Sequence, residues 1–220
     1  MVASEVDRRL GAGVQAALLR WQRRVDGGAA PRAAELMAAV QEEAIGRGLE
    51  GADLERALDR LQGGLAAYAE GPWPRRATLF LEQPVRHRLE DAGGFAADLR
   101  LRVDRVVRYR RQVAILDFKT VSPHAFELAV DRWQLLTYAL AAPELIGVPA
   151  AHVKLFLVDL RSGEDIAVRA SPKDLDGARR ALLGAVRGIA MEDFGVDGHP
   201  DRPCWACGFR QACPSSLARA

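Results

Sequence analysis

The chain has 220 residues, of which 49% are hydrophobic and 27% are charged, a balance typical of a soluble globular protein. This length predicts one domain of ordinary core size, or one domain with a helical extension. The formal net charge of +2 does not by itself indicate a nucleic-acid ligand. Its distribution is more informative, because residues 75–119 contain 11 Lys or Arg against 6 Asp or Glu, a surplus of 5. Such a surplus suits a polyanionic ligand, and a solvated arginine-rich face is the alternative.

The sequence lacks the patterns of a signal peptide, a membrane-spanning helix and a disulfide framework. Residues 1–10 carry both charge signs and lack the apolar stretch of a signal peptide. No apolar run approaches the ~18 residues that would predict a membrane-spanning helix. The three cysteines are clustered near one end, which does not fit the disulfide framework of a secreted protein. We therefore expect a cytoplasmic protein.

Apolar side chains at helical spacing predict three helices in the first third of the chain. The first helix ends at Asp26-Gly27-Gly28, and its apolar stripe consists of Leu10, Val14, Ala17, Trp21 and Val25. The second covers residues 33–46. The third ends at Gly71-Pro72, and its stripe consists of Leu54, Leu58, Leu61, Leu65 and Tyr68.

Strand patterns begin after the third helix. Residues 79–89, 95–109 and 112–120 predict a three-stranded meander. A helix over 126–142 is expected to end near Pro143, and strands are expected over 152–160 and 165–170. The last helix, over 172–190, begins at Ser171-Pro172, a favourable N-cap followed by proline. This order predicts an α/β or α+β fold with a central mixed sheet flanked by helices.

The most informative segment is VAILDFKT, residues 113–120, because its alternation places Asp117 and Lys119 on one face of a strand. An adjacent strand over residues 101–106 would bring Asp104 beside Asp117. Two carboxylates this close repel each other, and a hard divalent cation with oxygen ligands would relieve the repulsion. The alternative is an ordinary salt bridge between Lys119 and one of the aspartates.

These residues, with two later motifs, resemble the PD-(D/E)XK nuclease superfamily and its RecB-like branch. One motif is Gln134-x3-Tyr138, whose i, i+4 spacing places both side chains on one helix face. The other is CWACGFRQACP at 204–214, similar to the cysteine motif of AddB-type and CRISPR-adaptation nucleases. The resemblance implies a restriction-endonuclease-like core over residues 75–190. It also implies an N-terminal helical part over 1–74 and a cysteine-containing tail over 191–220.

The resemblance further implies a site for Mg²⁺ or Mn²⁺, held by Asp104, Asp117 and the backbone carbonyl of Phe118. Lys119 would then orient the attacking water or stabilise the transition state of phosphodiester hydrolysis. Gln134 and Tyr138 would act near the scissile phosphate or the bases. The alternative for this pair is a core tyrosine beside an exposed glutamine.

Weaker expectations concern residues around this set. Glu82 lies where related nucleases often carry a supporting glutamate on the first strand. RecB-like nucleases usually have a metal-binding histidine on an N-terminal helix, and the similar segment here, residues 11–15, has Gln15 at that position. An amide oxygen can ligate the metal, but it lacks the affinity of imidazole for Mn²⁺. The residues expected to contact DNA are Arg86, Arg88 and Arg105.

The cysteines leave several alternatives open. Cys204, Cys207 and Cys213 supply three thiolates, whereas a [4Fe–4S] cluster or a tetrahedral zinc site requires four ligands. In the related nucleases the fourth cysteine precedes the nuclease core, and these 220 residues contain no other cysteine. The alternatives are a cluster with an unidentified fourth ligand, a zinc site completed by His199, and unligated thiols.

Two functions from different classes are consistent with these features. The first is a metal-dependent DNA nuclease, expected to be an exonuclease acting on DNA ends or single strands in repair or recombination, with a helicase as partner. The second is a catalytically silent DNA-binding or scaffold module of a helicase–nuclease complex. Asp104, Asp117 and Lys119 favour the first function, and Gln15 favours the second.

Overall fold

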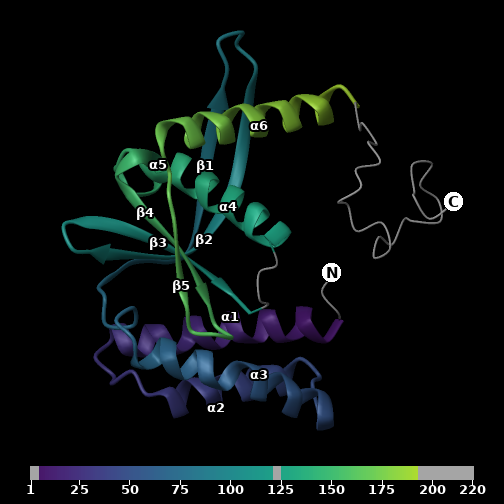
Figure 1. Cartoon of the computed structure of the whole chain (residues 1–220), viewed down its shortest axis with the longest axis vertical. Coiled ribbons are helices and arrows are strands. Elements are labelled where there is room, and N and C mark those ends of the chain that lie inside the picture. The colour runs from purple at the N-terminus through teal and green to yellow at the C-terminus, as the bar shows by residue number, and fades with distance from the viewer. Residues whose placement is uncertain (1–4, 121–124, 193–220) are drawn as a thin grey trace, which may run out of the picture.

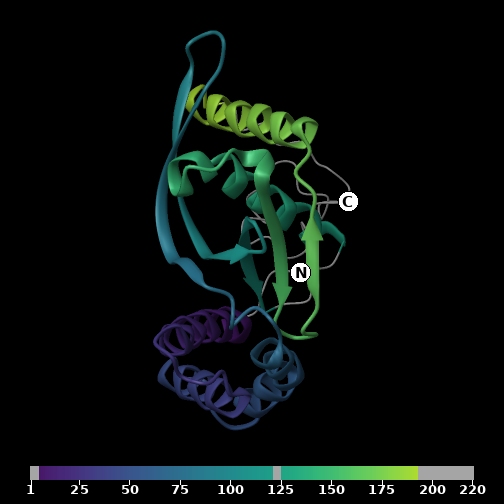
Figure 2. The same cartoon turned by 90° about the vertical axis from the view of Figure 1, so that its left-hand side faces the viewer.

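The computed structural model of the chain describes residues 5–120 and 125–192. The expected cysteine site, formed by Cys204, Cys207 and Cys213 with His199 as the alternative ligand, lies outside the described residues. A five-stranded sheet separates two groups of helices (Figure 1 and Figure 2). Among the helices of the described part, none is both long and apolar enough to cross a membrane.

Three helices pack on one face of the sheet. They are α1 (Glu5–Asp26), α2 (Ala33–Gly46) and α3 (Gly51–Glu70). The expected stripe on α1 is buried, with Leu10, Val14, Ala17 and Trp21 at most 3% exposed. Because these residues recur at three- and four-residue intervals, they lie on one side of the helix. That side joins a first hydrophobic core that includes α2, α3 and the sheet residue Leu116.

The sheet explains how distant segments meet. Its strands lie in the order β1 (Thr78–Glu90), β2 (Ala96–Tyr109), β3 (Gln112–Lys119), β4 (Val153–Asp159) and β5 (Asp165–Val168). Neighbouring strands are antiparallel except β3 and β4, which are parallel. A parallel pair needs a crossover connection, and here it contains the helix α4 (Ala125–Leu140). The expected α+β class with a central mixed sheet is confirmed.

The other face of the sheet is covered by α4, α5 (Ala142–Ile146) and α6 (Pro172–Ala190). They form a second hydrophobic core with the sheet, which includes Leu135 and Ile115. The expected helix over 126–142 is divided in two, because α4 ends at Leu140 and Pro143 lies in the first turn of α5, where proline is tolerated. Helix α6 begins at the expected cap, Ser171.

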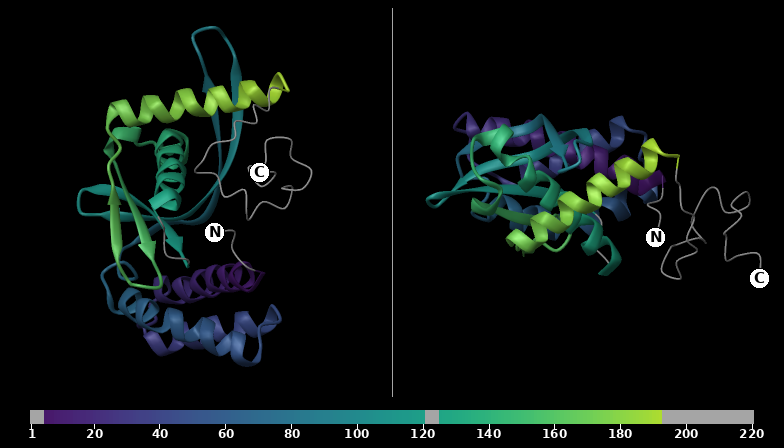
Figure 3. Two further views of the ribbon diagram at one scale, coloured as in Figure 1. Left: turned by 45° about the vertical axis from the view of Figure 1, so that its right-hand side comes forward. Right: turned by 90° about the horizontal axis from the view of Figure 1, so that it is seen from above.

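Strands β1 and β2 continue past α6 as a two-stranded hairpin (Figure 1 and Figure 3). Helix α6 braces this hairpin, because Arg179 Nη2 donates to Glu90 O at 2.5 Å and the Arg187 guanidinium lies 4.8 Å from the Phe95 ring centroid. One face of the hairpin packs on the second core through Val85 and Leu101. By the alternation of a strand, the opposite face carries the even-numbered residues of this stretch, several of which are arginines.

The turn after β4 lies unusually close to α3. A Cβ atom placed on Gly64 of α3 would lie 2.3 Å from Leu160 O. Within the turn, Gly163 has a φ of 77°, and a Cβ there would lie 2.5 Å from Ala67 Cβ. Both glycines therefore permit a backbone approach that no larger residue allows.

Candidate active site

Strand register brings Asp104 and Asp117 together. The β2–β3 ladder ends with the pair Arg105–Leu116, so the next position places Asp104 opposite Asp117. At this position a side-chain oxygen takes the place of a backbone carbonyl in the strand pairing, because Asp104 Oδ2 accepts a hydrogen bond from Phe118 N at 3.0 Å. Asp117 is 2% exposed, and Asp104 is partly buried. The two carboxyl groups are thus enclosed at the same place in the sheet.

Glu82 approaches Asp104 from β1. The pairs Leu81–Arg105 and Gln83–Val103 place Glu82 opposite Asp104. Its φ is 53°, a value that is uncommon for a residue other than glycine. Gln15 on α1 connects the two acids, because its Nε2 donates to Glu82 Oε1 at 2.7 Å and to Asp104 Oδ1 at 3.3 Å. The N-terminal helix therefore supplies a side chain directly beside the acids.

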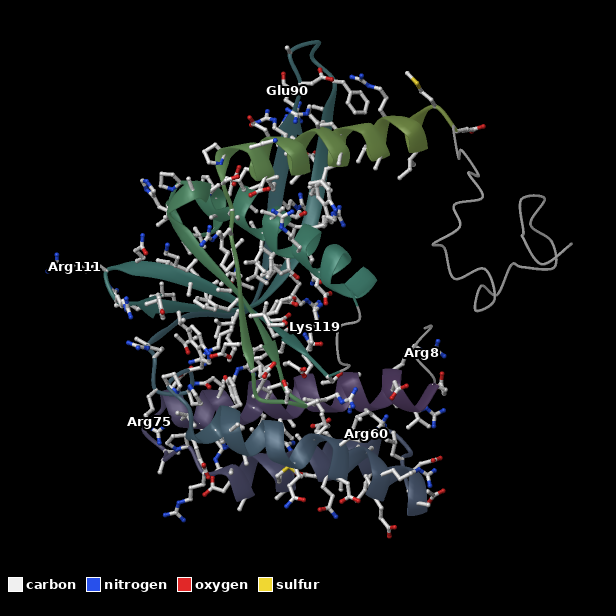
Figure 4. The ribbon with its side chains drawn as sticks, viewed as in Figure 1. Arg8, Arg60, Arg75, Glu90, Arg111 and Lys119 are labelled. Atoms are coloured by element: carbon white, nitrogen blue, oxygen red, sulfur yellow. The ribbon has the colours of Figure 1, made fainter. Side chains whose placement is uncertain are left out.

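Lys119, labelled in Figure 4, is held by α4 as well as by its own strand. Three oxygens lie 2.9 Å from its Nζ: Asp117 Oδ2, Asp131 Oδ1 and Gln134 Oε1. Gln134 Nε2 in turn donates to Tyr138 OH at 2.6 Å. The spacing i, i+3, i+7 places Asp131, Gln134 and Tyr138 on one helix face. The contact with Gln134 is a hydrogen bond, and the contacts with Asp117 and Asp131 are ion pairs, so the ammonium group is held from both its own strand and α4.

Burial governs the protonation of these groups. It raises the pKa of Asp104 to about 7, and the neighbouring Asp117 carboxylate adds to the increase. Burial also raises the pKa of Asp117, although Lys119 opposes the increase. For Lys119, burial alone would lower the pKa, but Asp117 and Asp131 outweigh it and raise the pKa to about 12. Without a cation, the two aspartates therefore resist being ionised together at neutral pH.

Arg105 does not lie on the DNA-facing surface where we expected it. Its side chain is 0% exposed, and its Nη2 lies 3.9 Å from Asp26 Oδ1. The guanidinium donates to Tyr68 OH at 3.1 Å, Trp73 O at 3.0 Å, Arg76 O at 3.1 Å and Thr78 Oγ1 at 2.8 Å. These bonds tie β2 to α3 and to the segment that leads into β1. Arg105 is therefore placed as a structural residue, because an enclosed side chain cannot contact DNA.

Arg86 and Arg88 are exposed on the hairpin. They lie opposite Arg100 and Asp98 on β2, and Arg88 Nη1 is 3.8 Å from Asp98 Oδ1. Both are farther along β1 than Glu82, so the structure places them outside the cluster formed around Asp104.

Asp131 is the residue at this site that sequence reasoning missed. The available signal was its spacing, because a residue three positions before Gln134 shares the same helix face. Acidic residues on amphipathic helices usually face solvent, which is why the spacing alone did not single it out. In the structure its side chain is 14% exposed.

The sequence matches the profile of the PD-(D/E)XK nuclease superfamily over residues 2–214. The chain belongs to this superfamily. Among solved structures, the chain resembles the "Putative exonuclease" from Eubacterium rectale, with a TM-score of 0.53 and 13% identity, over 96% of this chain and 76% of that one. It also matches the crystal structure of SSO0001 with a TM-score of 0.45 and 17% identity, over 88% of this chain and 85% of that one. At 13% identity the first likeness shows a shared fold alone. No curated protein sequence matches the chain.

Members of the PD-(D/E)XK superfamily generally use divalent metal ions, and the acids of this chain suit such an ion in part. Asp104 and Asp117 offer carboxylate oxygens, the preferred donors of hard cations. Asp117 Oδ2 is buried and accepts no hydrogen bond of acceptable geometry, although Lys119 Nζ is 2.9 Å away. Within residues 5–120 and 125–192, no group of three or more His, Cys, Asp or Glu side chains is arranged to hold a metal ion. A bound ion would therefore need neutral oxygen donors beside the two aspartates.

Asp104→Asn should stabilise the protein at about pH 8 when divalent ions are removed. The pKa of Asp104 is about 7 in the folded protein, against about 3.9 in an unfolded chain. A folded state that binds the proton more tightly loses stability as the pH rises from about 4 through about 7. The substituted amide does not titrate and avoids this loss. The difference of about 3 pKa units corresponds to about 4 kcal/mol. The amide loses about 2 kcal/mol of this gain, because its NH2 group faces one of the two donors, Phe118 N and Gln15 Nε2. We therefore expect the variant to exceed the wild type by about 2 kcal/mol at about pH 8, measured by urea unfolding in EDTA.

Asp174 serves as a control, because its pKa is lowered in the folded protein whereas that of Asp104 is raised. Hydrogen bonds from Ser171 and Arg132 lower its pKa to about 2, so its contribution is present above about pH 4 and is lost as the pH falls through about 2. Asp174→Asn should therefore leave the decline between about pH 4 and 7 unchanged. If Asp104→Asn showed the same decline as the wild type, the burial of Asp104 would not be the cause.

Proposed function

We propose that this protein is a metal-dependent DNA nuclease of the RecB-like branch. The observation that carries the proposal is the placement of Lys119, whose Nζ lies 2.9 Å from oxygens of both Asp117 and Gln134. One structural neighbour carries the name "Putative exonuclease", and we extend that mode, action on DNA ends or single strands, to this chain as part of the proposal. A role in repair or recombination, with a helicase as partner, belongs to the same proposal.

In this proposal each residue of the site has a defined task. Asp104 and Asp117, with the backbone carbonyl of Phe118, hold Mg²⁺ or Mn²⁺. When bound, such an ion polarises a phosphoryl oxygen and lowers the pKa of water. Lys119 is charged at neutral pH, because Asp117 raises its pKa, and it donates to the attacking water or to the charge that develops in the transition state. Gln134, itself held by Tyr138, keeps the ammonium group in position.

The path of the DNA is proposed along the arginine face of the hairpin, the surface formed by Arg86, Arg88, Arg100 and Arg102. All four side chains are exposed. Residues directly opposite each other in an antiparallel pair share a face, and the pairs Pro84–Arg102 and Arg86–Arg100 place these arginines on one side. Arg102 Nη1 lies 3.8 Å from Glu82 Oε2, so the arginine face begins beside the site. Backbone phosphates are the ligands that such a row of guanidinium groups suits best.

A second candidate function is a catalytically silent DNA-binding or scaffold module. The observation that favours it is the amide of Gln15, whose Nε2 donates to both Glu82 and Asp104. A donor held between two carboxylates satisfies them without a cation. In this alternative the arginine face still binds DNA, but the acids serve to fasten α1 to the sheet.

A cleavage assay on DNA of defined topology tests the proposal. End-labelled linear single-stranded DNA, linear duplex DNA and circular DNA are incubated with the full chain in Mg²⁺ or Mn²⁺. We expect label to be released from linear DNA, because an exonuclease needs an end, and circular DNA to remain intact. Asp117→Ala should abolish the release without abolishing DNA binding.

The outcomes separate the two functions. Binding without cleavage by the wild type would favour the silent module. Equal cleavage by the wild type and Asp117→Ala would remove these residues from the reaction. Cleavage of circular DNA would keep the nuclease assignment and replace the exonuclease mode by an endonuclease mode.

The RecB-like assignment rests in addition on the cysteine motif, which lies outside the described residues. Cys204, Cys207 and Cys213 are proposed to hold a [4Fe–4S] cluster with a fourth ligand still to be identified. The domain limits proposed with it are a helical part over 1–74, a nuclease core over 75–190 and a tail over 191–220.

A further inference from the structure

A cavity lies at the turn between β2 and β3, which carries Arg111, labelled in Figure 4. Its volume is about 540 Å³, within the range of about 300–1,000 Å³ that is usual for ligand sites. Its polar lining consists of Arg108, Arg110, Arg111, Gln112 and His152. Its apolar lining consists of Leu79, Val113, Val148 and Pro149. None of the lining residues is acidic.

The three arginines of this cavity lack carboxylate partners. Among the described residues, no carboxylate lies within ion-pair distance of Arg108, Arg110 or Arg111. Many helical arginines do have such partners, for example Arg20 with Glu42 and Arg132 with Asp174. Like charges gathered around one cavity repel one another, and an anionic ligand removes that repulsion.

The turn itself is built from residues that do not favour a turn. Tyr109 pairs with Gln112, so Arg110 and Arg111 form a two-residue hairpin loop. Such loops favour Asn-Gly or another pair with glycine, because their backbone requires positive φ. Arg110 has a φ of 55°, and its guanidinium lies 5.6 Å from the Tyr109 ring centroid. Arg110 therefore costs conformational energy at this position, and both loop arginines place positive charge at the cavity.

The cavity is separate from the candidate active site. Strand β3 begins at Gln112, which lines the cavity, and ends at Lys119. At a rise of about 3.3 Å per residue, these positions are about 23 Å apart. A mononucleotide bound in the cavity therefore cannot reach Asp104 or Asp117.

We propose that this cavity is a second binding site, for a nucleotide phosphate. The guanidinium groups of Arg108 and Arg111 bind the phosphate oxygens, since guanidinium matches phosphate geometry with paired hydrogen bonds. The apolar wall formed by Leu79, Val113 and Pro149 receives the sugar and base. The phosphate group comes from a free nucleotide or from a nucleic-acid strand. This inference does not depend on the proposed nuclease activity.

Calorimetric titration of the full chain in EDTA tests the site, because cleavage does not occur without divalent ions if the protein is a metal-dependent nuclease. The probes are deoxyadenosine 5′-monophosphate and a short 5′-phosphorylated oligodeoxynucleotide. Arg108→Ala/Arg111→Ala should weaken binding of at least one probe by about tenfold or more, the effect expected for losing charge-assisted hydrogen bonds. Arg180→Ala is the matched control, since Arg180 is exposed on α6 and does not line the cavity.

Each result has a defined meaning. Weakened binding of the mononucleotide assigns the cavity to free nucleotides, and weakened binding of the oligonucleotide alone assigns it to a strand. Equal affinities for the double variant and for Arg180→Ala would overturn the proposal. An Arg86→Ala/Arg100→Ala variant separates this site from the arginine face, because only oligonucleotide binding should fall in it.

Discussion

Lys119→Met should lower the rate of DNA cleavage by a factor of about 10² to 10³, the usual effect of removing one donor that stabilises a transition state. The side chain of methionine has similar length but no charge, so the apolar part of the contact is kept. Because Lys119 acts on the charge that develops during the reaction, we expect the loss in kcat and little change in KM. Single-turnover cleavage of end-labelled DNA measures the effect directly.

Asp131→Asn is the informative companion to this variant. It removes one carboxylate 2.9 Å from Lys119 Nζ but leaves Asp117 and Gln134 in place. The ammonium group should therefore stay in the site with less restraint, and the rate should fall by about tenfold or less. If Lys119→Met cleaved DNA as fast as the wild type while Asp117→Ala did not cleave it, Lys119 would serve only to pair with Asp117.

Gly64→Ala should lower the free energy of unfolding by about 3 kcal/mol, at the upper end of the range for overpacked sites. The added methyl group would meet backbone atoms, Leu160 O at 2.3 Å and Arg161 C at 2.5 Å. Backbone cannot move aside as a flexible side chain can, so α3 and the turn after β4 must separate. Urea unfolding followed by circular dichroism measures the change.

The neighbouring residue, Gly63, provides the control within the same helix. A Cβ on Gly63 meets nothing within 4 Å. Gly63→Ala should therefore be neutral or stabilise the protein by up to about 1 kcal/mol through helix propensity. Similar losses for both variants would mean that helix α3 itself, and not its approach to Leu160, limits stability.

Much of this fold could be predicted from the sequence, because hydrophobic periodicity is a local property. The helix over 33–46 has the expected bounds, and the strand expected over 112–120 differs from β3 by one residue. The break between α4 and α5 was not predicted, because Pro143 suits the first turn of a new helix as well as the end of an old one. The parallel pairing of β3 and β4 also depends on tertiary structure rather than on local pattern.

Parts of the candidate site depend on long-range contacts that no pattern in the sequence expresses. Alternation placed Asp117 and Lys119 on one face, and their 2.9 Å ion pair agrees with that expectation. Alternation also put Glu82 on a regular strand, whereas its φ of 53° distorts the backbone of β1 beside Asp104. Arginine is usually a surface residue, so the sequence favoured an exposed Arg105. Its burial is possible because acceptors from α3 and from the segment before β1 satisfy its guanidinium group.

The two hydrophobic cores meet at the candidate site. Gln15 follows Val14, which is anchored in the first core, whereas Tyr138 is anchored in the second. The sheet acids lie between these two side chains. A ligand that engages both sides would therefore cross-link two separately packed halves of the molecule. Binding of such a ligand should slow amide hydrogen exchange in α1 and α4 together, although the two helices belong to different cores.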